Sequence, residues 1–333
     1  MIKKVVWGML STARIGLRKV IPGMQKSDWC EVRAIASRTQ AGAGKAAKTL
    51  GIPKAYGSYQ DLLADPQIEA VYNPLPNHLH VPMTLAAAQA GKHVLCEKPI
   101  ALTASEAAQL RDAAGKVLIM EGFMVRFHPQ WLRARQLLRE GAIGDLRAVQ
   151  MFFSYHNTDP SDIRNDAAIG GGALYDIGCY AIVAGRFFFG SEPKRAIALI
   201  DRDPAFGTDS LSSALVDFGG LRHLGFTVST QSVPFQRLQL CGNKGRIELP
   251  IPVNAPQGET TKLLIDNGAA LDGSGIRTET IALSDQYQLQ GEVFSRAIRG
   301  DIALPYGIDD AVANMNVLDA LFRSAQSGSW EAL

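Results

Sequence analysis

The stretch His93-Val94-Leu95-Cys96-Glu97-Lys98-Pro99-Ile100 decides how the rest of this chain is interpreted. Its first four residues are typical of a short buried strand, which a charged pair and a proline then end abruptly. Open α/β sheets bind ligands at the carboxyl ends of their strands, so we expect Lys98 at a ligand-binding edge. The following proline restricts the backbone of Lys98. The alternative is a surface turn, because lysine is mostly exposed. A catalytic Lys98 therefore requires a cofactor site and a proton-transfer partner elsewhere in the chain.

Length and composition indicate two globular domains. A chain of 333 residues is longer than the chains that usually fold around one hydrophobic core. The formal net charge of +2 predicts no general attraction to nucleic acid or to an anionic membrane. The start of the chain contains no separate hydrophobic signal segment, and no apolar run is long enough to span a bilayer, so we expect a cytoplasmic protein with no membrane partner. The four cysteines contain no Cys-x-x-Cys pair, which favours reduced buried thiols.

The first half of the chain alternates predicted strands and helices, as in a doubly wound parallel sheet. We expect strands at 2–10, 31–36, 69–72, 93–96 and 116–120. Helices are expected from 16 to about 24, at 40–50, from near 58 and at 81–90. Thr103 with Glu106 is typical of a capping box at the start of a further helix. This alternation predicts a dinucleotide-binding domain over residues 1–121.

The turn after the first strand is where such a fold binds a pyrophosphate. The glycine-rich pattern is only partly present: with Gly16 as the third glycine, Ser11 and Ala13 stand at the first two positions. Small residues still allow the backbone to approach a phosphate, and a helix N-terminus still offers free N–H groups. An ordinary strand–helix turn is the alternative. We assign this part of the cofactor site to Gly8, Ser11, Thr12, Ala13, Arg14 and Ile15.

The end of the second strand predicts which nicotinamide cofactor binds. An NAD site carries Asp or Glu about twenty residues beyond the glycine-rich turn, where it binds the ribose 2′-hydroxyl. This chain has Ser37-Arg38-Thr39 instead. Arginine and two hydroxyls suit a 2′-phosphate, which a carboxylate would repel. We therefore predict NADP, with a solvated Arg38 in a loop as the alternative.

A proline-rich loop, residues 73–80, is expected at the same edge of the sheet. His78 and His80 suggest a metal, but no nearby cysteine or carboxylate completes a ligand set, so we predict no metal site. Hydrogen bonding to the nicotinamide ribose, or loop capping by Asn77, explains these residues better. We place Asn73, Leu75, Asn77 and His78 in the cofactor site.

Beyond residue 121 the pattern changes, which predicts a second domain over 122–333. A helix at 130–140, a strand at 146–155 and a polar loop at 157–168 precede the glycine run 170–172. Asp176 and Tyr180 follow it four residues apart, so they share a face if this segment is helical. From 195 to 283 the chain is mostly strands, with hairpin turns at 219–220 and 242–245, and helices near 286–299 and 309–326 end it.

Four separated motifs resemble the Gfo/Idh/MocA oxidoreductases. They are Glu97-Lys98-Pro99, the Asn77/His78 loop, Arg126-x-His128-Pro129 and Gly-Gly-Gly-Ala-Leu-x-Asp176-x-Gly178-x-Tyr180. The chain is most similar to the branch that holds glucose–fructose oxidoreductase, aldose–aldose oxidoreductase, NADP-dependent xylose dehydrogenase and dimeric dihydrodiol dehydrogenase. The resemblance implies a Rossmann domain followed by an α+β domain with a large open, mainly antiparallel sheet. It also implies that Lys98, Asp176 and Tyr180 occupy catalytic positions.

These positions suit the oxidation of a sugar hemiacetal, which needs a base and a hydride acceptor. A free tyrosine, with a pKa of about 10, is a poor base, and an ammonium within roughly 4–6 Å lowers that pKa. We expect Lys98 and Tyr180 to share the substrate oxygen, with Asp176 orienting a hydroxyl or balancing the lysine charge. Glu97 and Arg126 complete the predicted cofactor set, and Arg126 and His156 are weaker candidates for substrate contact. The alternatives are a packed Tyr180, a helix-terminus role for Asp176 and a buried ion pair for Arg126.

The leading hypothesis is an NADP-dependent enzyme that oxidises an aldopyranose at the anomeric carbon to an aldonolactone. In one variant the same bound cofactor then reduces a second aldose to an alditol. The alternatives are an NADP-dependent dehydrogenase or reductase with an exchanging cofactor, acting on xylose, an anhydro-sugar or a dihydrodiol, and a non-catalytic sugar or cofactor sensor. We also predict a homodimer formed through the sheet of the second domain, because few helices are available to cover its outer face.

Overall fold

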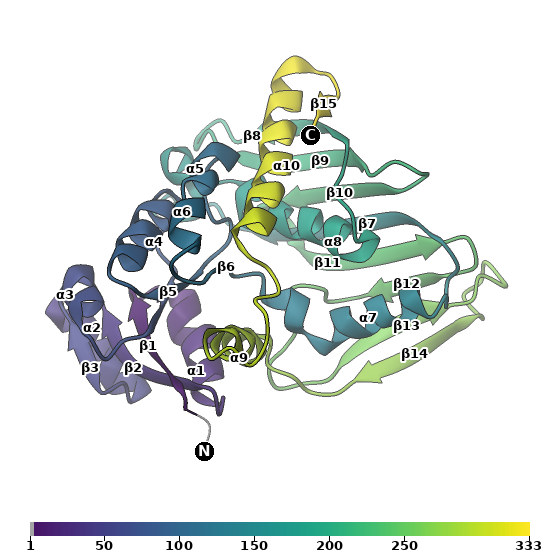
Figure 1. Ribbon diagram of the computed structural model, residues 1–333. Coiled ribbons are helices and arrows are strands. Elements are labelled where there is room, and N and C mark those ends of the chain that lie inside the picture. Colours follow the sequence, from purple (N-terminus) through teal and green to yellow (C-terminus); the bar gives the residue numbers. More distant parts are fainter. Residues whose placement is uncertain (1–2) are drawn as a thin grey trace. The chain divides into compact units, whose positions relative to one another are not determined.

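The computed structural model describes residues 3–333, which form two compact units (Figure 1). Unit 1 comprises the described chain up to Met124 together with Asp285–Met315. Unit 2 comprises Val125–Ser284 and Asn316–Leu333. The expected division at residues 121 and 122 lies close to the first crossing between the units. The segment 285–315, however, was expected in the second domain and belongs to unit 1.

Unit 1 is built on a six-stranded parallel sheet in the order β3-β2-β1-β4-β5-β6. This is the strand order of dinucleotide-binding folds, and its direction reverses between β1 and β4. Among these strands only the short β3 was not predicted, because its three half-buried residues show no alternation. The strands are β1 (Val5–Leu10), β2 (Cys30–Ala36), β3 (Lys54–Tyr56), β4 (Ala70–Asn73), β5 (His93–Cys96) and β6 (Ile119–Glu121).

Helices follow the strands of unit 1 as predicted. The first begins at residue 14 and contains a π-helical turn, η1 (Gly16–Val20), before α1 (Ile21–Gln25). The capping box at Thr103 is shifted by one residue: Thr103 accepts a hydrogen bond from the Glu106 N–H, and the Glu106 carboxylate accepts one from Leu102 N–H. The other helices are α2 (Gln40–Leu50), α3 (Tyr59–Ala64), η2 (Asn77–Leu79), α4 (His80–Gln89), α5 (Ala104–Ala108) and α6 (Arg111–Ala114).

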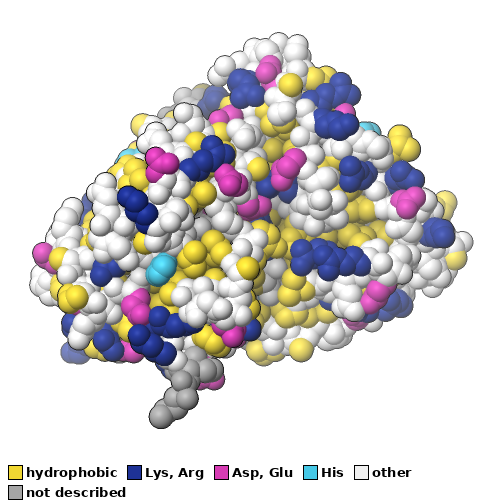
Figure 2. All heavy atoms as spheres, viewed as in Figure 1, with side chains coloured by type: hydrophobic (Ala, Val, Ile, Leu, Met, Phe, Trp, Pro, Cys, Tyr) yellow, Lys and Arg dark blue, Asp and Glu magenta, His cyan; other side chains and the backbone are white. Residues whose placement is uncertain are grey.

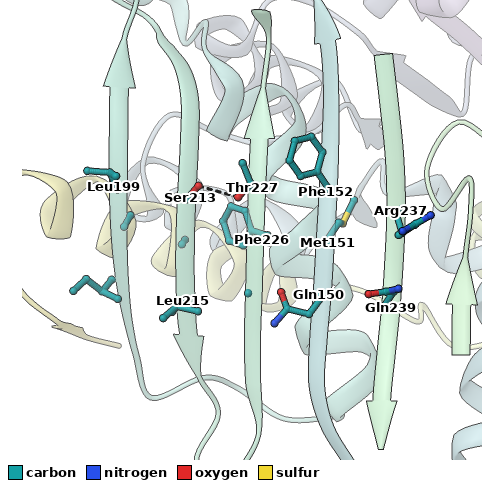
Figure 3. Close-up of a pocket in the computed structure, with 14 residues that line it drawn as sticks. Gln150, Met151, Phe152, Leu199, Ser213, Leu215, Phe226, Thr227, Arg237 and Gln239 are labelled. Atoms are coloured by element: carbon teal, nitrogen blue, oxygen red, sulfur yellow. Dashed lines mark hydrogen bonds between the residues drawn. The ribbon is translucent and has the colours of Figure 1, made fainter. Parts of the chain in front are cut away.

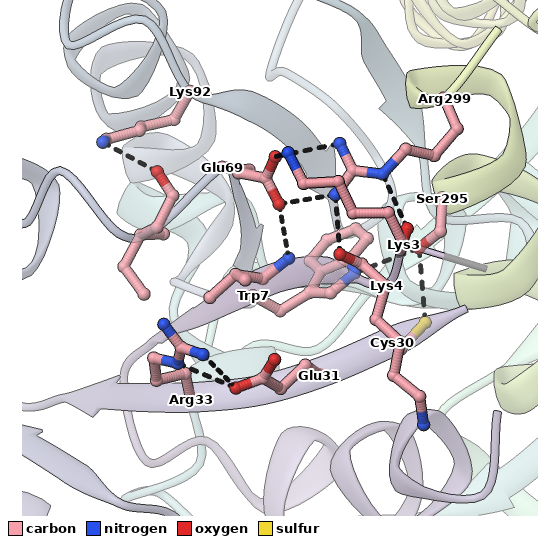
Figure 4. Close-up of polar contacts among 12 residues, drawn as sticks. Lys3, Lys4, Trp7, Cys30, Glu31, Arg33, Glu69, Lys92, Ser295 and Arg299 are labelled. Atoms are coloured by element: carbon pink, nitrogen blue, oxygen red, sulfur yellow. Dashed lines mark hydrogen bonds and ion pairs between the residues drawn. The ribbon is translucent and has the colours of Figure 1, made fainter. Parts of the chain in front are cut away.

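Helix α9 (Gln286–Ile298) explains why residues 285–315 belong to unit 1. It packs against α1 and β2, and the Trp7 indole N–H donates to the Ser295 hydroxyl at 3.1 Å. Directly after α9, Arg299 forms two hydrogen bonds with the Glu69 carboxylate, at 2.8 and 2.6 Å (Figure 4). Glu69 also accepts a hydrogen bond from the Val6 N–H of β1. The contact between Arg299 and Glu69 joins residues 230 positions apart, which local sequence patterns do not reveal.

Unit 2 is built on a nine-stranded sheet in the order β14-β13-β12-β11-β7-β10-β9-β8-β15. Neighbouring strands are antiparallel except for β7 and β10, which confirms the expected mainly antiparallel sheet. The strands are β7 (Leu146–His156), β8 (Arg195–Arg202), β9 (Asp209–Asp217), β10 (His223–Ser229), β11 (Gln231–Gly242), β12 (Arg246–Leu249), β13 (Thr261–Asp266), β14 (Ile276–Ile281) and β15 (Glu331–Ala332).

Helices cover one face of this sheet. Helix α8 (Cys179–Phe189) packs on β7 and β10, and α7 (Pro129–Arg139) packs beside β13. Helix α10 (Ile308–Ser327) begins in unit 1 and ends in unit 2. The short helical segments of unit 2 are η4 (Ile163–Asn165), η5 (Ala167–Ile169) and the π-helical η6 (Leu174–Gly178), and η3 (Met124–Phe127) lies at the boundary between the units.

One helical segment, Ala167–Phe189, has the length and apolar composition of a membrane span among the residues that the structure describes. Its most apolar window is 67% buried inside the structure, which identifies it as a core helix of unit 2. On the face seen in Figure 2, basic and acidic side chains are interspersed, in agreement with the net charge of +2.

Candidate functional site

Four segments of unit 1 begin where neighbouring parallel strands end. They are residues 11–15 after β1, 37–39 after β2, 74–78 after β4, and 97–98 after β5. Because these strands run parallel and lie side by side, the four segments meet at one edge of the sheet. Strands β1 and β4 flank the reversal of strand order, which is where such sheets bind ligands. The structure thus brings together most of the predicted cofactor residues.

The turn after β1 keeps the required shape without its first glycine. Ser11 has a φ of 77°, a left-handed conformation that glycine adopts readily, and its hydroxyl accepts a hydrogen bond from Ala13 N–H at 3.1 Å. Gly8 was also assigned to the cofactor site, but it lies inside β1. A Cβ at Gly8 would approach Leu62 to 2.6 Å, so the structure gives this glycine a packing role.

The segment after β2 leads into the N-terminus of α2. The Thr39 hydroxyl accepts a hydrogen bond from Gly42 N–H at 3.1 Å, and Arg38 is exposed. Tyr59, which sequence analysis missed, lies near Arg38: burial raises the pKa of this phenol, and the guanidinium charge opposes that rise. A guanidinium, the hydroxyls of Ser37 and Thr39, and a helix N-terminus fit a 2′-phosphate.

Asn73 and His80 organise the loop after β4. The Asn73 amide donates to the His80 carbonyl at 3.1 Å, and its oxygen accepts from Leu75 N–H at 3.3 Å. The two ring nitrogens of His80 face the carbonyl oxygens of Leu75 and Pro99, at 2.6 and 2.7 Å. Burial lowers the pKa of His80 to about 4. Asn73 therefore holds the loop, whereas the buried Nδ1 of His78 has no partner among the described residues and fits a cofactor contact.

Neighbouring elements brace the turn 97–99 that carries the predicted catalytic lysine. The Tyr72 hydroxyl of β4 donates to the Glu97 carboxylate at 2.6 Å. The Glu121 carboxylate of β6 accepts a hydrogen bond from the Ile100 N–H, directly after the turn, at 2.8 Å. The third contact that holds the turn is the one between the His80 ring and the Pro99 carbonyl oxygen. Lys98 is half-buried, and its peptide bond to Pro99 is cis. Glu97, expected among the cofactor residues, thus also positions this turn.

Asp176 is the centre of a polar cluster in unit 2. It lies in the π-helical turn η6, and Tyr180 follows in the first turn of α8. The Tyr155 hydroxyl at the end of β7 donates to Asp176 Oδ2 at 2.6 Å, and Arg164 Nε donates to the same oxygen at 3.2 Å. Burial, and then the Asp176 charge, raise the pKa of Tyr155, and Asp176 raises the pKa of Arg164. Tyr155 and Arg164 were not among the predicted site residues, because neither belongs to a motif.

Successive side chains of β7 point to opposite faces of the sheet, so two candidates for substrate contact, Asp176 and His156, can be compared by whether they lie on the same face as Tyr155. Tyr180 is buried, and its ring lies 6.4 Å from that of Phe153, centroid to centroid. Phe153 and Tyr155 share the face of β7 that α8 covers, because side chains two apart in a strand point the same way. His156 is exposed and points to the opposite face, so it does not share the face that contacts Asp176. Arg126 is buried in η3.

The glycine run before η6 lets two backbone segments approach closely. The N–H groups of Gly171 and Gly172 both donate to carbonyls of the 157–168 loop at 2.9 Å. A Cβ at Gly171 would lie 2.5 Å from the Arg164 carbonyl oxygen. From β9, the Asp209 carboxylate accepts a hydrogen bond from Leu174 N–H, the first residue of η6, at 2.7 Å. Burial raises the pKa of Asp209 to about 6.

Metal-ligating side chains are not grouped in the described part of the chain. Residues 3–333 contain no set of three or more His, Cys, Asp or Glu side chains placed to hold a metal ion. All four cysteines are free thiols, and three of them are buried.

The fold and the residues at the edge of its parallel sheet are those of an NAD(P)-binding oxidoreductase. Residues 5–120 match the model of an oxidoreductase family with an NAD-binding Rossmann fold, and residues 131–248 match the GFO/IDH/MocA C-terminal domain. The chain therefore belongs to the Gfo/Idh/MocA oxidoreductase family, as the resemblance of its motifs predicted.

Individual relatives match the chain over almost its full length. It is 37% identical to D-xylose 1-dehydrogenase (NADP(+)) 2 of Haloferax volcanii over 330 residues, 98% of each chain. KijD10, a 3-ketoreductase from Actinomadura kijaniata solved in complex with NADP, has a TM-score of 0.90 and 26% identity, covering 97% of this chain and 98% of that one. Aldose-aldose oxidoreductase from Caulobacter crescentus has a TM-score of 0.89 and 27% identity, covering 99% and 100%.

Proposed function

We propose that this protein oxidises an aldopyranose at the anomeric carbon to an aldonolactone, with NADP⁺ as the hydride acceptor. The observation that carries the proposal is Lys98, held by three braces at the carboxyl edge of a dinucleotide-binding sheet. The 37% identity to a relative named as an NADP-dependent D-xylose 1-dehydrogenase supports both the cofactor and the reacting carbon.

NADP is proposed over NAD because of the segment after β2. Arg38 is exposed there, next to the hydroxyl of Thr39 and the N-terminus of α2. A 2′-phosphate would form an ion pair with the guanidinium, whereas the neutral 2′-hydroxyl of NAD would give it no charged partner. Ser37-Arg38-Thr39 also lacks the carboxylate that would bind an unphosphorylated ribose.

Three side chains are proposed to handle the substrate. Tyr180 takes the proton of the anomeric hydroxyl, and the Lys98 ammonium lowers the pKa of that phenol. Asp176 accepts a hydrogen bond from a second substrate hydroxyl and so fixes the sugar ring. Bound NADP⁺ supplies the acceptor for the hydride that leaves the anomeric carbon. In the reverse direction Tyr180 returns the proton to a carbonyl oxygen.

A coupled reaction is the second candidate. Its support is the TM-score of 0.89 to an enzyme named aldose-aldose oxidoreductase. In this version the protein would retain its cofactor between the two half-reactions, and the reduced cofactor would supply the hydride that converts a second aldose to an alditol. The mass spectrum of the protein as purified distinguishes the two candidates, because a coupled enzyme is expected to carry NADP(H) and an ordinary dehydrogenase is not.

The test of the proposed function follows NADPH formation with a panel of aldoses and identifies the lactone by mass spectrometry. Tyr180→Phe keeps the ring and removes the proton carrier, so turnover should fall by ~10²–10⁴. Lys98→Met should be comparably damaging, and the double variant should lose much less than the product of the two effects. The matched controls Tyr56→Phe and Lys48→Met should retain wild-type turnover. An inactive wild type, or near-normal turnover of Tyr180→Phe, would show that the proposal is wrong.

We also propose that the protein works in the cytoplasm as a homodimer joined through the outer face of the unit 2 sheet. On that face Leu199 and Leu215 are 69% and 51% exposed. Together with Phe152 they line a shallow hollow of ≈ 540 Å³ across β7–β11 (Figure 3). An exposed apolar face of this kind normally has a partner, and a second copy of the same face would cover it symmetrically.

A further inference from the structure

We propose that Arg164 and Tyr155 are positioning residues that hold Asp176 as a fixed anionic acceptor for one hydroxyl of a neutral polyhydroxy substrate. This inference rests on the proposed function and adds a specificity determinant to it. It assigns Asp176 to recognition of the sugar and not to proton transfer.

The two donors converge on one oxygen of Asp176. The Tyr155 hydroxyl is 2.6 Å and Arg164 Nε is 3.2 Å from Oδ2, and they come from a strand end and a loop. Both hydrogen bonds have an ionised partner, which makes them stronger than neutral ones. Rotation of the carboxylate would break both together. The cluster therefore fixes the orientation of Asp176, and the guanidinium favours its ionised form.

The same contacts determine what Tyr155 does. Burial raises the pKa of its phenol, and the neighbouring Asp176 charge raises it further, whereas Arg164 opposes the rise. Tyr155 consequently stays protonated and acts as a permanent donor to Asp176. A tyrosine that stays protonated cannot act as the base, so Tyr155 leaves that role to Tyr180, as in the proposed function.

Hydrogen bonds to the backbone of Arg164 fix the position of this residue. Gly172 N–H donates to the Arg164 carbonyl at 2.9 Å, and a Cβ at Gly171 would overlap that carbonyl. Asp162 caps η4 through the Arg164 N–H at 3.0 Å and contacts the guanidinium at 3.3 Å. The glycine run 170–172 thus holds the 157–168 loop close to η6, so that Arg164 of this loop reaches Asp176.

The exposure of the cluster indicates the class of ligand. The Asp176 side chain is 17% exposed and the Arg164 side chain 44% exposed, so a ligand in water can reach them. A carboxylate already balanced by a guanidinium suits a neutral hydroxyl donor. A site built to bind a hydroxyl discriminates strongly against an analogue that lacks it. Wild type is therefore expected to prefer an aldose over the monodeoxy analogue that lacks this hydroxyl.

The test compares single and double variants in sugar oxidation and, by calorimetry, in sugar binding to the NADP⁺-loaded protein. Arg164→Gln and Tyr155→Phe should each lower kcat/KM by ~10-fold or more, mainly through KM, because each removes a hydrogen bond to a charged group. Arg164→Lys should recover part of the loss. In an Asp176→Ala background both substitutions should have almost no further effect, because the oxygen that accepts their hydrogen bonds is gone. The preference over the deoxy sugar should fall in the same variants.

Arg147→Gln is the matched control, because Arg147 pairs with Asp145 at 3.0 Å on the surface of the same unit. It should behave as wild type, and thermal unfolding should show all variants folded. The inference is overturned if Arg164→Gln keeps wild-type KM, or if its loss persists undiminished in the Asp176→Ala background. If wild type binds sugars with this pattern but does not oxidise them, the proposed function fails and the inference stands. If wild type neither binds nor oxidises any sugar, both fail.

Discussion

Replacing Asp209 by Asn is expected to remove a pH dependence of stability between about pH 4 and pH 6. Asp209 is 1% exposed and accepts hydrogen bonds from Leu174 N–H at 2.7 Å and from the Ser212 hydroxyl at 3.0 Å. An asparagine side-chain oxygen can accept the same two hydrogen bonds. The substitution therefore removes the ionisation while it keeps the anchor at the start of η6.

The magnitude follows from the pKa of this carboxyl group. Burial raises the pKa of Asp209 from 3.8 to about 6. The folded protein then holds a proton that the unfolded chain has lost between about pH 4 and pH 6, so the free energy of unfolding falls as pH rises through this window. With about 1.36 kcal/mol for each pKa unit, wild type should lose ~3 kcal/mol relative to Asp209→Asn between pH 4 and pH 7.

The assay is urea unfolding of both proteins, followed by tryptophan fluorescence, at half-unit steps of pH. The difference between the two free energies of unfolding isolates Asp209, because every other titrating group is shared. Asp201→Asn, an exposed aspartate of β8, is the control and should give a curve parallel to wild type. Parallel curves for wild type and Asp209→Asn would show that burial does not raise this pKa and would refute the reasoning.

The remaining predictions concern the cofactor and the assembly. Arg38→Ala should weaken NADP(H) binding by ~10-fold or more and leave NAD(H) binding nearly unchanged, because only the 2′-phosphate pairs with the guanidinium; equal losses for both cofactors, measured by fluorescence titration, would contradict the NADP assignment. Leu215→Glu places a charge on the outer face of the unit 2 sheet and should convert a dimer into a monomer in light scattering, whereas a wild type that already has the monomer mass of 35.9 kDa would contradict the proposed dimer.

Local patterns in the sequence determined most of the architecture. The alternation of short apolar runs with alanine-rich segments predicted all but one strand of unit 1, because burial on both faces of a parallel sheet leaves a readable apolar run. Motif spacing placed Lys98 at the end of β5 and Asp176 and Tyr180 in adjoining helical turns. These features depend on residues within a few positions of one another, so the sequence displays them directly.

Only the tertiary structure revealed the contacts between distant segments. The association of α9 with unit 1 depends on Arg299 and Glu69, 230 residues apart. Tyr155 and Arg164, which donate hydrogen bonds to Asp176, belong to no motif. One comes from a strand end and the other from a loop, and such contacts leave no periodic pattern in the sequence. Such contacts depend on where the backbone brings side chains together in space, which the chemistry of neighbouring residues does not specify.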